Sequence, residues 1–128
     1  MRIYCSGPMT GHPDHNRPAF DAAERRLTAQ GHFVINPVNI SCTFGTPKEV
    51  ANSFAYYYDD MKAFQIKSAF RADMMRLAEC VMDADFAAVR SCDAIYLLRG
   101  WESSRGAKKE LAEALSHGLQ VMQEGGEE

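Results

Sequence analysis

Two short β-prone runs with a helical segment between them stand near the start of the sequence. Residues 2–5 (RIYC) lead into a Ser-Gly-Pro turn, and residues 32–37 (HFVINP) end at a proline, which cannot donate a hydrogen bond to a sheet. Between them, Pro18 suits the first turn of a helix, Asp21 its positive N-terminal end, and Gly31 its C-terminal stop. A strand, a helix and a strand within about 35 residues predict a βαβ unit with parallel strands and a right-handed crossover.

The following sequence continues this alternation of helix and strand. A helical period extends from residue 68 to residue 89, with a potential break around Asp83 and Asp85. Two more strands are expected at 93–98 and 119–122, with a last long helix between them. We therefore predict one α/β domain over residues 1–128, with a mainly parallel sheet of about four to five strands.

Two segments do not follow the alternation. Residues 38–67 include the tyrosine triplet 56–58 and show no sustained period. We interpret them as an insertion or lid with some helix, which covers a site or contacts another subunit. Residues 123–128 (QEGGEE) are expected to be a frayed tail.

Charge and composition exclude several classes of function. The 128 residues carry a net charge of −3 without a cluster of Lys and Arg, so a nucleic-acid polymer is not an expected partner. No run approaches the ~20 apolar residues of a membrane span, and the N-terminus does not match a signal peptide. We therefore expect a cytoplasmic protein without membrane contact.

Neither a metal site nor a disulfide framework is expected. Residues 12–15 (HPDH) contain metal-donor side chains but no third partner is evident, so a solvated loop is the favoured interpretation. The cysteines form no CxxC pair, which predicts reduced and buried thiols at Cys5, Cys42, Cys80 and Cys92.

The strand pattern also predicts where a small ligand binds. In parallel sheets of this kind, ligands bind in a crevice beyond the carboxyl ends of the strands, at the point where the strand order reverses. For about four strands in the order 2-1-3-4, this crevice lies between strands 1 and 3. The loops at residues 6–11 (SGPMTG) and 99–106 (RGWESSRG) meet there, and Ser103 or Ser104 caps the helix after the second loop. Backbone N–H groups at such turns bind anions, so a small-molecule site is expected.

Glu110 lies in the helix that follows the second loop. At about 100° per residue it falls at the edge of the apolar stripe of this helix and beside the crevice, whereas Lys109 faces away. A carboxylate that is shielded from water at such a place can attack a sugar when a second group helps the leaving group depart. The alternative is an ordinary helix-forming glutamate, and spacing alone favours that alternative.

Several stretches together resemble a known family: MRIYCSGPMTG, GHFVINP, DFAAVRSCDAIYLLRGWESSRGAKKE and HGLQV. They are similar to a family of small bacterial and phage proteins within the nucleoside 2-deoxyribosyltransferase-like superfamily, over nearly the whole chain except about 38–67. The resemblance implies a flavodoxin-like or Rossmann-like three-layer fold. It also implies cleavage of the N-glycosidic bond of a small deoxynucleoside or deoxynucleotide by a glutamate nucleophile, which passes the sugar to water or to another base without a metal or an organic cofactor.

The resemblance assigns roles to individual residues. The superfamily's Ser-x-Gly-x-x-x-Glu pattern falls on Ser104, Gly106 and Glu110, which makes Glu110 the implied nucleophile at C1′ of the sugar. Tyr4 matches a first-strand tyrosine that orients this glutamate. The superfamily's aspartates at a separation of eight match Asp85 and Asp93. Asp85 is the implied general acid. Asp93 is a further substrate-binding candidate, but it begins a strand whose other end lies at the crevice, which favours a structural role for Asp93.

The other substrate-binding candidates lie in the two loops: Gly7, Thr10, Gly11 and Trp101. Trp101 can either stack on a base or pack against its own domain, and the sequence favours neither alternative. Relatives that hydrolyse deoxynucleoside monophosphates have a serine and an arginine that bind the phosphate where this chain has Pro8 and Thr10. The sequence therefore allows either a free nucleoside or a nucleotide as the substrate. Arg17 or Arg105 is available to supply the charge.

The altered first loop also supports a second class of function. The alternative to the enzyme is a nucleotide-binding or sensing module that keeps the crevice and has lost turnover. In either case the resemblance implies a homodimer or a larger homo-oligomer, because sites in this superfamily are often completed by a neighbouring subunit.

Overall fold

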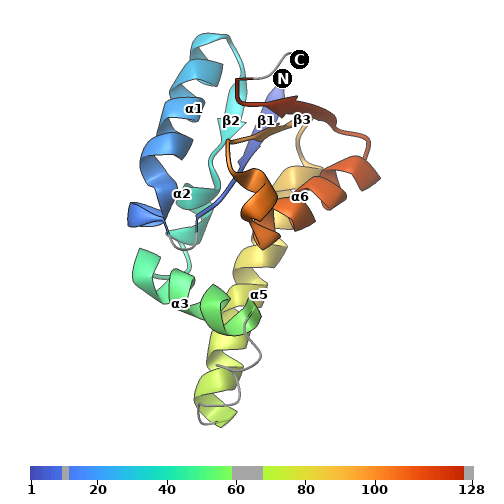
Figure 1. The fold of residues 1–128 in the computed structure, drawn as a ribbon. Coiled ribbons are helices and arrows are strands. Elements are labelled where there is room, and N and C mark those ends of the chain that lie inside the picture. Colours follow the sequence, from blue (N-terminus) through green and yellow to red (C-terminus); the bar gives the residue numbers. More distant parts are fainter. Residues whose placement is uncertain (10–11, 59–67, 126–128) are drawn as a thin grey trace.

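Four parallel strands form the central sheet of the computed structural model, which describes residues 1–9, 12–58 and 68–125 (Figure 1). They are β1 (Arg2–Ser6), β2 (Phe33–Ile35), β3 (Ala94–Leu97) and β4 (Gln120–Gln123), in the spatial order β2-β1-β3-β4. All three neighbouring pairs are parallel, and Ile3 of β1 faces Val34 on one side and Ala94 on the other. The predicted sheet, with its order reversing between β1 and β3, is confirmed.

Helices cover both faces of this sheet, which gives the three layers of a flavodoxin-like or Rossmann-like fold. They are η1 (Pro13–Asn16), α1 (Arg17–Ala29), α2 (Pro37–Ser41), α3 (Pro47–Tyr58), α5 (Ser68–Arg90), η2 (Trp101–Ser103) and α6 (Arg105–Ser116). In Figure 1, α1 lies on one side of the sheet and α6 on the other, while α5 extends past the sheet beside α3. The expected break around Asp83 and Asp85 is wrong, because α5 is continuous through both residues and packing outweighs their modest helix propensity.

The central strands β1 and β3 are buried on both faces, and their side chains alternate between two apolar clusters. Ile3 and Cys5 of β1 pack with Phe20 and Leu27 of α1 on one face. Tyr4 packs with Ile95, Leu97, Val89 and Ala114 on the face that α5 and α6 cover. Because side chains along a strand alternate with a period of two, Ser6 points to the same face as Tyr4.

The cysteines and the C-terminal segment differ in part from expectation. All four thiols are free, but only Cys5 and Cys92 are buried; Cys42 and Cys80 are exposed. Gln123 belongs to β4, and the Glu124 carboxylate accepts hydrogen bonds from Arg26 at 2.9 Å and from the backbone N–H of Arg99 at 3.0 Å. The tail is therefore anchored through Glu124, contrary to the expected fraying from residue 123, and 126–128 lie outside the described residues.

The segment 38–67 contains more helix than its irregular pattern indicates. Residues 38–41 belong to α2, which Asn36 caps by accepting a hydrogen bond from the N–H of Val38 at 3.1 Å. Residues 47–58 form α3, whose inward side lines a pocket, while residues 59–67 lie outside the described part. Within the described residues, no helix has both the length and the apolar character needed to cross a membrane.

Gly7 stands where β1 ends and where no side chain fits. A Cβ atom added there would lie 2.7 Å from Cβ of Leu98, a fully buried side chain. Gly7→Ala should therefore lower the free energy of unfolding by about 1–3 kcal/mol through overpacking. Thermal denaturation measures this loss. Gly45→Ala is the matched control, because its Cβ meets Glu49 at an ordinary 3.5 Å, and an equal loss in both variants would contradict the account.

Candidate functional site

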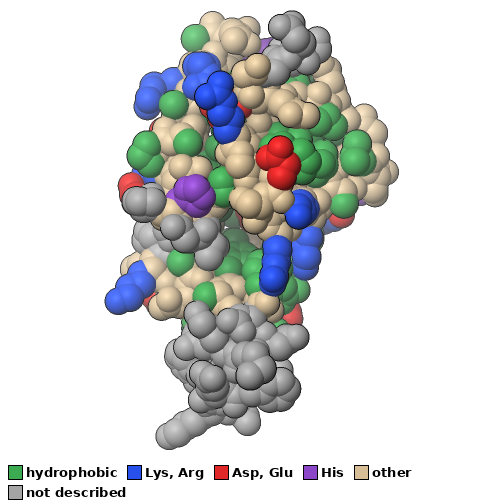
Figure 2. Space-filling model, in the orientation of Figure 1, with side chains coloured by type: hydrophobic (Ala, Val, Ile, Leu, Met, Phe, Trp, Pro, Cys, Tyr) green, Lys and Arg blue, Asp and Glu red, His purple; other side chains and the backbone are tan. Residues whose placement is uncertain are grey.

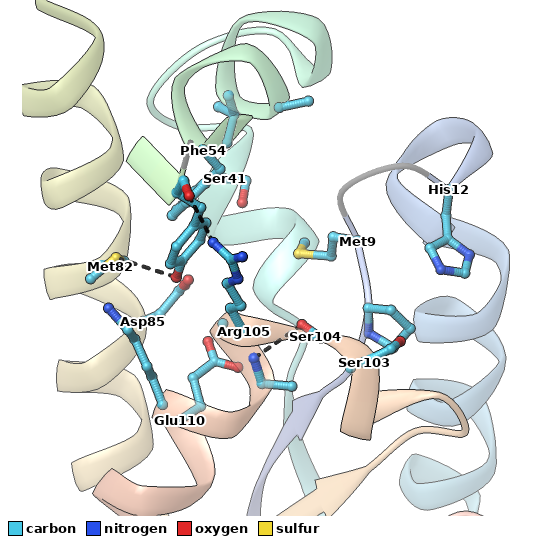
Figure 3. Close-up of a pocket in the computed structure, with 18 of the residues that line it drawn as sticks. Met9, His12, Ser41, Phe54, Met82, Asp85, Ser103, Ser104, Arg105 and Glu110 are labelled. Carbon is cyan, nitrogen blue, oxygen red and sulfur yellow. Dashed lines mark hydrogen bonds between the residues drawn. The ribbon is translucent and has the colours of Figure 1, made fainter. Parts of the chain in front are cut away.

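A pocket of about 320 Å³ opens at the carboxyl end of β1, between α3, α5 and the start of α6 (Figure 3). Residues 7–9 after β1 and residues 103–107 after β3 both line it, so the two loops expected to meet do meet. The α3 helix forms a largely apolar wall, and Met82 and Phe86 of α5 extend this apolar lining. Such a mixture of apolar walls with a few convergent polar groups is typical of sites for small organic ligands.

Glu110 lies at the inner end of this pocket and accepts two hydrogen bonds from β1. The Tyr4 hydroxyl donates to Oε2 at 2.7 Å, and the Ser6 hydroxyl donates to Oε1 at 2.6 Å. Tyr4 and Ser6 are two residues apart on one strand and fully buried, so both side chains point toward α6. Glu110 itself is only 9% exposed, so its carboxylate is held from the sheet side and presented to the pocket.

Asp85 of α5 is the second buried carboxyl of the pocket. The residue is 8% exposed, and its Oδ1 atom has no hydrogen-bond partner among the residues that the structure describes. A buried polar atom without a partner costs free energy, and such atoms concentrate at functional sites. In Figure 3, Asp85 and Glu110 extend from their two helices toward the same space.

Burial raises the pKa of both carboxyls, but the neighbouring groups affect the two pKa values differently. The Glu110 charge raises the Asp85 pKa further, whereas the hydroxyls of Ser6 and Tyr4 oppose the rise in the Glu110 pKa. Tyr4 also opposes the rise in the Asp85 pKa, and burial and the Glu110 charge keep the Tyr4 pKa itself well above its usual range. Glu110 is therefore the carboxyl of this pair that ionises first as the pH rises, whereas Asp85 keeps its proton to a higher pH.

The start of α6 supplies hydrogen-bond donors next to these carboxyls. Gly100, with a φ of 86°, lets the chain turn from β3 into η2. Ser104 then caps α6, because its hydroxyl accepts a hydrogen bond from the N–H of Ala107 at 3.1 Å, which resolves the choice between Ser103 and Ser104. Ser104 and Gly106 both line the pocket.

Basic side chains of α6 surround the outer part of the pocket. Arg105 donates a hydrogen bond to the backbone carbonyl of Tyr58 at 2.7 Å, and its guanidinium lies 5.5 Å from the centre of the Tyr58 ring. The Lys109 ammonium lies 5.3 and 5.2 Å from the rings of Tyr57 and Tyr58. Figure 2 shows basic side chains gathered near the junction of α6 with α3. Lys109 thus lines the pocket instead of facing away from it, because α3 extends the site outward over this side of α6.

The structure brings most of the expected site residues together. Gly7, Asp85, Ser104, Gly106 and Glu110 line the pocket, and Tyr4 supports Glu110 from behind. Thr10 and Gly11 lie outside the described residues.

Two expected substrate-binding residues lie elsewhere. Asp93 precedes β3 at the opposite end of the sheet, where its carboxylate accepts a hydrogen bond from the N–H of Arg2 at 2.8 Å; its role there is structural. Trp101 packs against the cluster beneath α6 and borders a separate, smaller hollow next to Glu124, so packing, not stacking on a base in this pocket, is its observed role.

Sequence reasoning missed Ser6 and Phe54, whereas it expected the segment that contains Tyr58 to be a lid or a subunit contact. The signal for Ser6 was its position two residues after Tyr4, which places both hydroxyls on one face of the strand. Phe54 had no comparable signal, because the path of α3 across the site depends on tertiary packing. His12 also lines the pocket, but the described residues contain no group of three His, Cys, Asp or Glu side chains that could hold a metal ion.

Comparison with known proteins gives a family and no assigned activity. A family model described as a domain of unknown function, DUF4406, matches residues 1–123, which is nearly the whole chain. Neither the curated proteins nor the solved structures gave a significant match. The chain, with its parallel sheet and its pair of buried carboxyls, therefore belongs to the DUF4406 family.

Proposed function

We propose that this protein cleaves the N-glycosidic bond of a small deoxynucleoside or deoxynucleotide, with Glu110 as nucleophile. The observation that carries the proposal is a pair of buried carboxyls that lie in one pocket and differ in their hydrogen-bond partners. Glu110 accepts two hydroxyl hydrogen bonds, whereas one oxygen of Asp85 has no partner within the described part of the chain. Two carboxyls whose environments separate their pKa values are typical of glycosidic cleavage, in which one is the nucleophile and the other the acid.

The reaction proceeds in two balanced steps. In the first, a Glu110 oxygen bonds to C1′ of the sugar, the bond from C1′ to the base nitrogen breaks, and Asp85 gives its proton to the departing base. In the second, the Asp85 carboxylate takes a proton from water or from an acceptor base, which attacks C1′ and releases Glu110. Tyr4 keeps the carboxylate of Glu110 oriented throughout.

The outer part of the pocket favours a substrate with an anionic group. Arg105 and Lys109 provide positive charge there, opposite to the carboxyls at the inner end. A 5′-phosphate near these cations would leave the glycosidic bond directed toward Glu110. We therefore propose a deoxynucleoside monophosphate as the preferred substrate, with the free deoxynucleoside as the weaker one.

Arg105→Ala should raise KM for the monophosphate by about 10-fold while changing KM for the free nucleoside by less than about 3-fold. The reason is that the guanidinium contacts only the charged substrate. Steady-state kinetics on both substrates measure the difference. Lys108→Ala is the matched control, since Lys108 is exposed, adjacent in sequence and outside the pocket lining. Equal effects of Arg105→Ala on both substrates would contradict the phosphate assignment.

Chromatographic detection of free base tests the proposed reaction itself. The protein is incubated with the common deoxynucleosides, ribonucleosides and their monophosphates, and an added second base separates transfer from hydrolysis. Base release from at least one deoxy substrate is the expected result. Binding that raises the thermal stability of the folded protein without base release would instead favour the nucleotide-binding module.

A further inference from the structure

Ser6 is a buried polar residue that the reaction scheme above does not use. It lies at the end of β1, is fully buried, and faces Leu97 in the register of the sheet. The same side of the sheet carries the apolar cluster beneath α5 and α6. A hydroxyl at such a place has a desolvation cost that an alanine would avoid, and its hydrogen bond to Glu110 offsets that cost.

The geometry of the two hydroxyls indicates what Ser6 does. Tyr4 holds Oε2 of Glu110 and Ser6 holds Oε1, so each carboxylate oxygen has its own donor. One hydrogen bond would leave the carboxylate free to rotate about its terminal torsion, which is broad for glutamate. Two donors from one rigid strand fix the plane of the carboxylate, and both favour its ionised form.

We propose that Ser6 is a positioning residue that fixes the carboxylate plane of Glu110 and favours its ionised form. The catalytic consequence of this role rests on the function proposed above, whereas the effect on Glu110 itself does not. Ser6 donates to an atom on another element across the site, so its contribution is separate from that of Tyr4. Without it, one buried oxygen of Glu110 would lack its donor.

The charged and titratable groups around Glu110 come from every neighbouring element. Tyr4 faces it from β1, Asp85 from α5 and Tyr58 from α3, while Arg105 and Lys109 precede it on α6 and His12 lies at the pocket lining. Among the hydrogen bonds that oppose the effect of burial on the Glu110 pKa, the one from Ser6 is the largest. Loss of the Ser6 hydroxyl should therefore raise the pKa of Glu110 further.

Titration of Glu110 by NMR tests this role without relying on activity. Side-chain carboxyl signals of labelled glutamate are followed against pH in the wild type and in Ser6→Ala, and Glu110→Gln identifies the Glu110 signal by its loss. The titration midpoint should rise by about one pH unit or more in Ser6→Ala. Ser6→Cys keeps the shape of the side chain, with a larger atom that is a weak donor, and should give a smaller rise, so it also serves if Ser6→Ala does not fold.

Ser53→Ala is the matched control, because Ser53 is equally buried but donates to the carbonyl of Val50 in α3 at 2.7 Å. It should leave the Glu110 midpoint unchanged. In kinetics, Ser6→Ala should lower kcat at neutral pH by about 10-fold or more with little change in KM, and the loss should shrink as the pH rises. A structural role alone would lower activity equally at every pH.

The outcomes separate this inference from the proposed function. An unchanged Glu110 midpoint in both Ser6 variants would overturn the role of Ser6, whatever the activity. A raised midpoint in a wild-type protein that releases no base would uphold the role of Ser6 and overturn the glycosidic reaction.

Discussion

Glu110→Gln should reduce the rate of base release by about 10⁴-fold or more, because it replaces the nucleophilic carboxylate with a neutral, weakly nucleophilic amide. Glutamine keeps the shape of the side chain and still accepts a hydrogen bond through its amide oxygen, so the pocket should persist. It cannot form the covalent ester with C1′. Single-turnover measurement of free base, with enzyme in excess, gives the rate of the bond-breaking step directly.

Glu113→Gln is the matched control for this substitution. Glu113 stands three residues further along α6, but its carboxylate pairs with Arg90 at 2.8 Å and with His117 at 3.1 Å, away from the pocket. Its replacement should cost little activity, since exposed ion pairs contribute about 0–1 kcal/mol of stability. Base release that survives in Glu110→Gln at the level of Glu113→Gln would remove Glu110 from the mechanism.

Asp85→Asn should slow the release of ordinary bases by about 10²–10⁴-fold, because asparagine cannot give a proton to the departing nitrogen. The loss depends on the leaving group. A base that is already positively charged, as in 7-methyl-2′-deoxyguanosine, departs as a neutral molecule and needs no proton. Single-turnover rates on this substrate and on 2′-deoxyguanosine measure the contrast, and equal losses on both would contradict the role of Asp85 as acid.

Asp85→Asn should also alter the dependence of stability on pH. The pKa of Asp85 is raised in the folded protein by burial and by the Glu110 charge, so folding favours its protonated form. This contribution is fully present below the unfolded pKa of about 4 and is lost as the pH rises through the folded value. The melting temperature of the wild type should therefore fall from acidic toward alkaline pH. Asp85→Asn should be the flatter of the two and the more stable at alkaline pH, and a steeper curve would contradict the assignment.

The sheet could be predicted from sequence because each of its determinants is local or general. The apolar runs mark the strands, Pro18 and Gly31 bound the first helix, and the right-handed crossover leaves few arrangements for parallel strands. The order β2-β1-β3-β4 follows from these constraints. The break expected around Asp83 and Asp85 shows the limit of local propensity, since burial of Asp85 at the site depends on what packs against α5.

The site could be predicted only as far as the two loops and one helix face define it. The helical angle put Glu110 beside the crevice, and its burial against β1 agrees with that placement. Asp85 and Tyr4 entered through the resemblance alone, because helix α5 and strand β1 lie far from Glu110 in sequence. Of the two aspartates at a separation of eight, Asp93 was expected at the far end of its strand and lies there, whereas no local feature indicated the burial of Asp85 at the pocket.

The outer wall of the pocket could not be predicted, because it depends on long-range packing. Helix α3 crosses the mouth of the site and brings Tyr57 and Tyr58 against Lys109, so this exposed lysine, which was expected to face away, lines the pocket. No periodicity within 38–67 carries that information. Assembly into a homodimer or a larger homo-oligomer stays a prediction, which light scattering measures.

Mass spectrometry of the protein quenched during its first turnover is the most direct test of the glutamate mechanism. The protein is mixed with the deoxy substrate that releases base fastest, acidified within that turnover, and digested into peptides. We expect the peptide that contains Glu110 to gain the mass of the sugar moiety in the wild type and in Glu113→Gln, and to gain nothing in Glu110→Gln. Release of base during the first turnover without any sugar on this peptide would contradict the account.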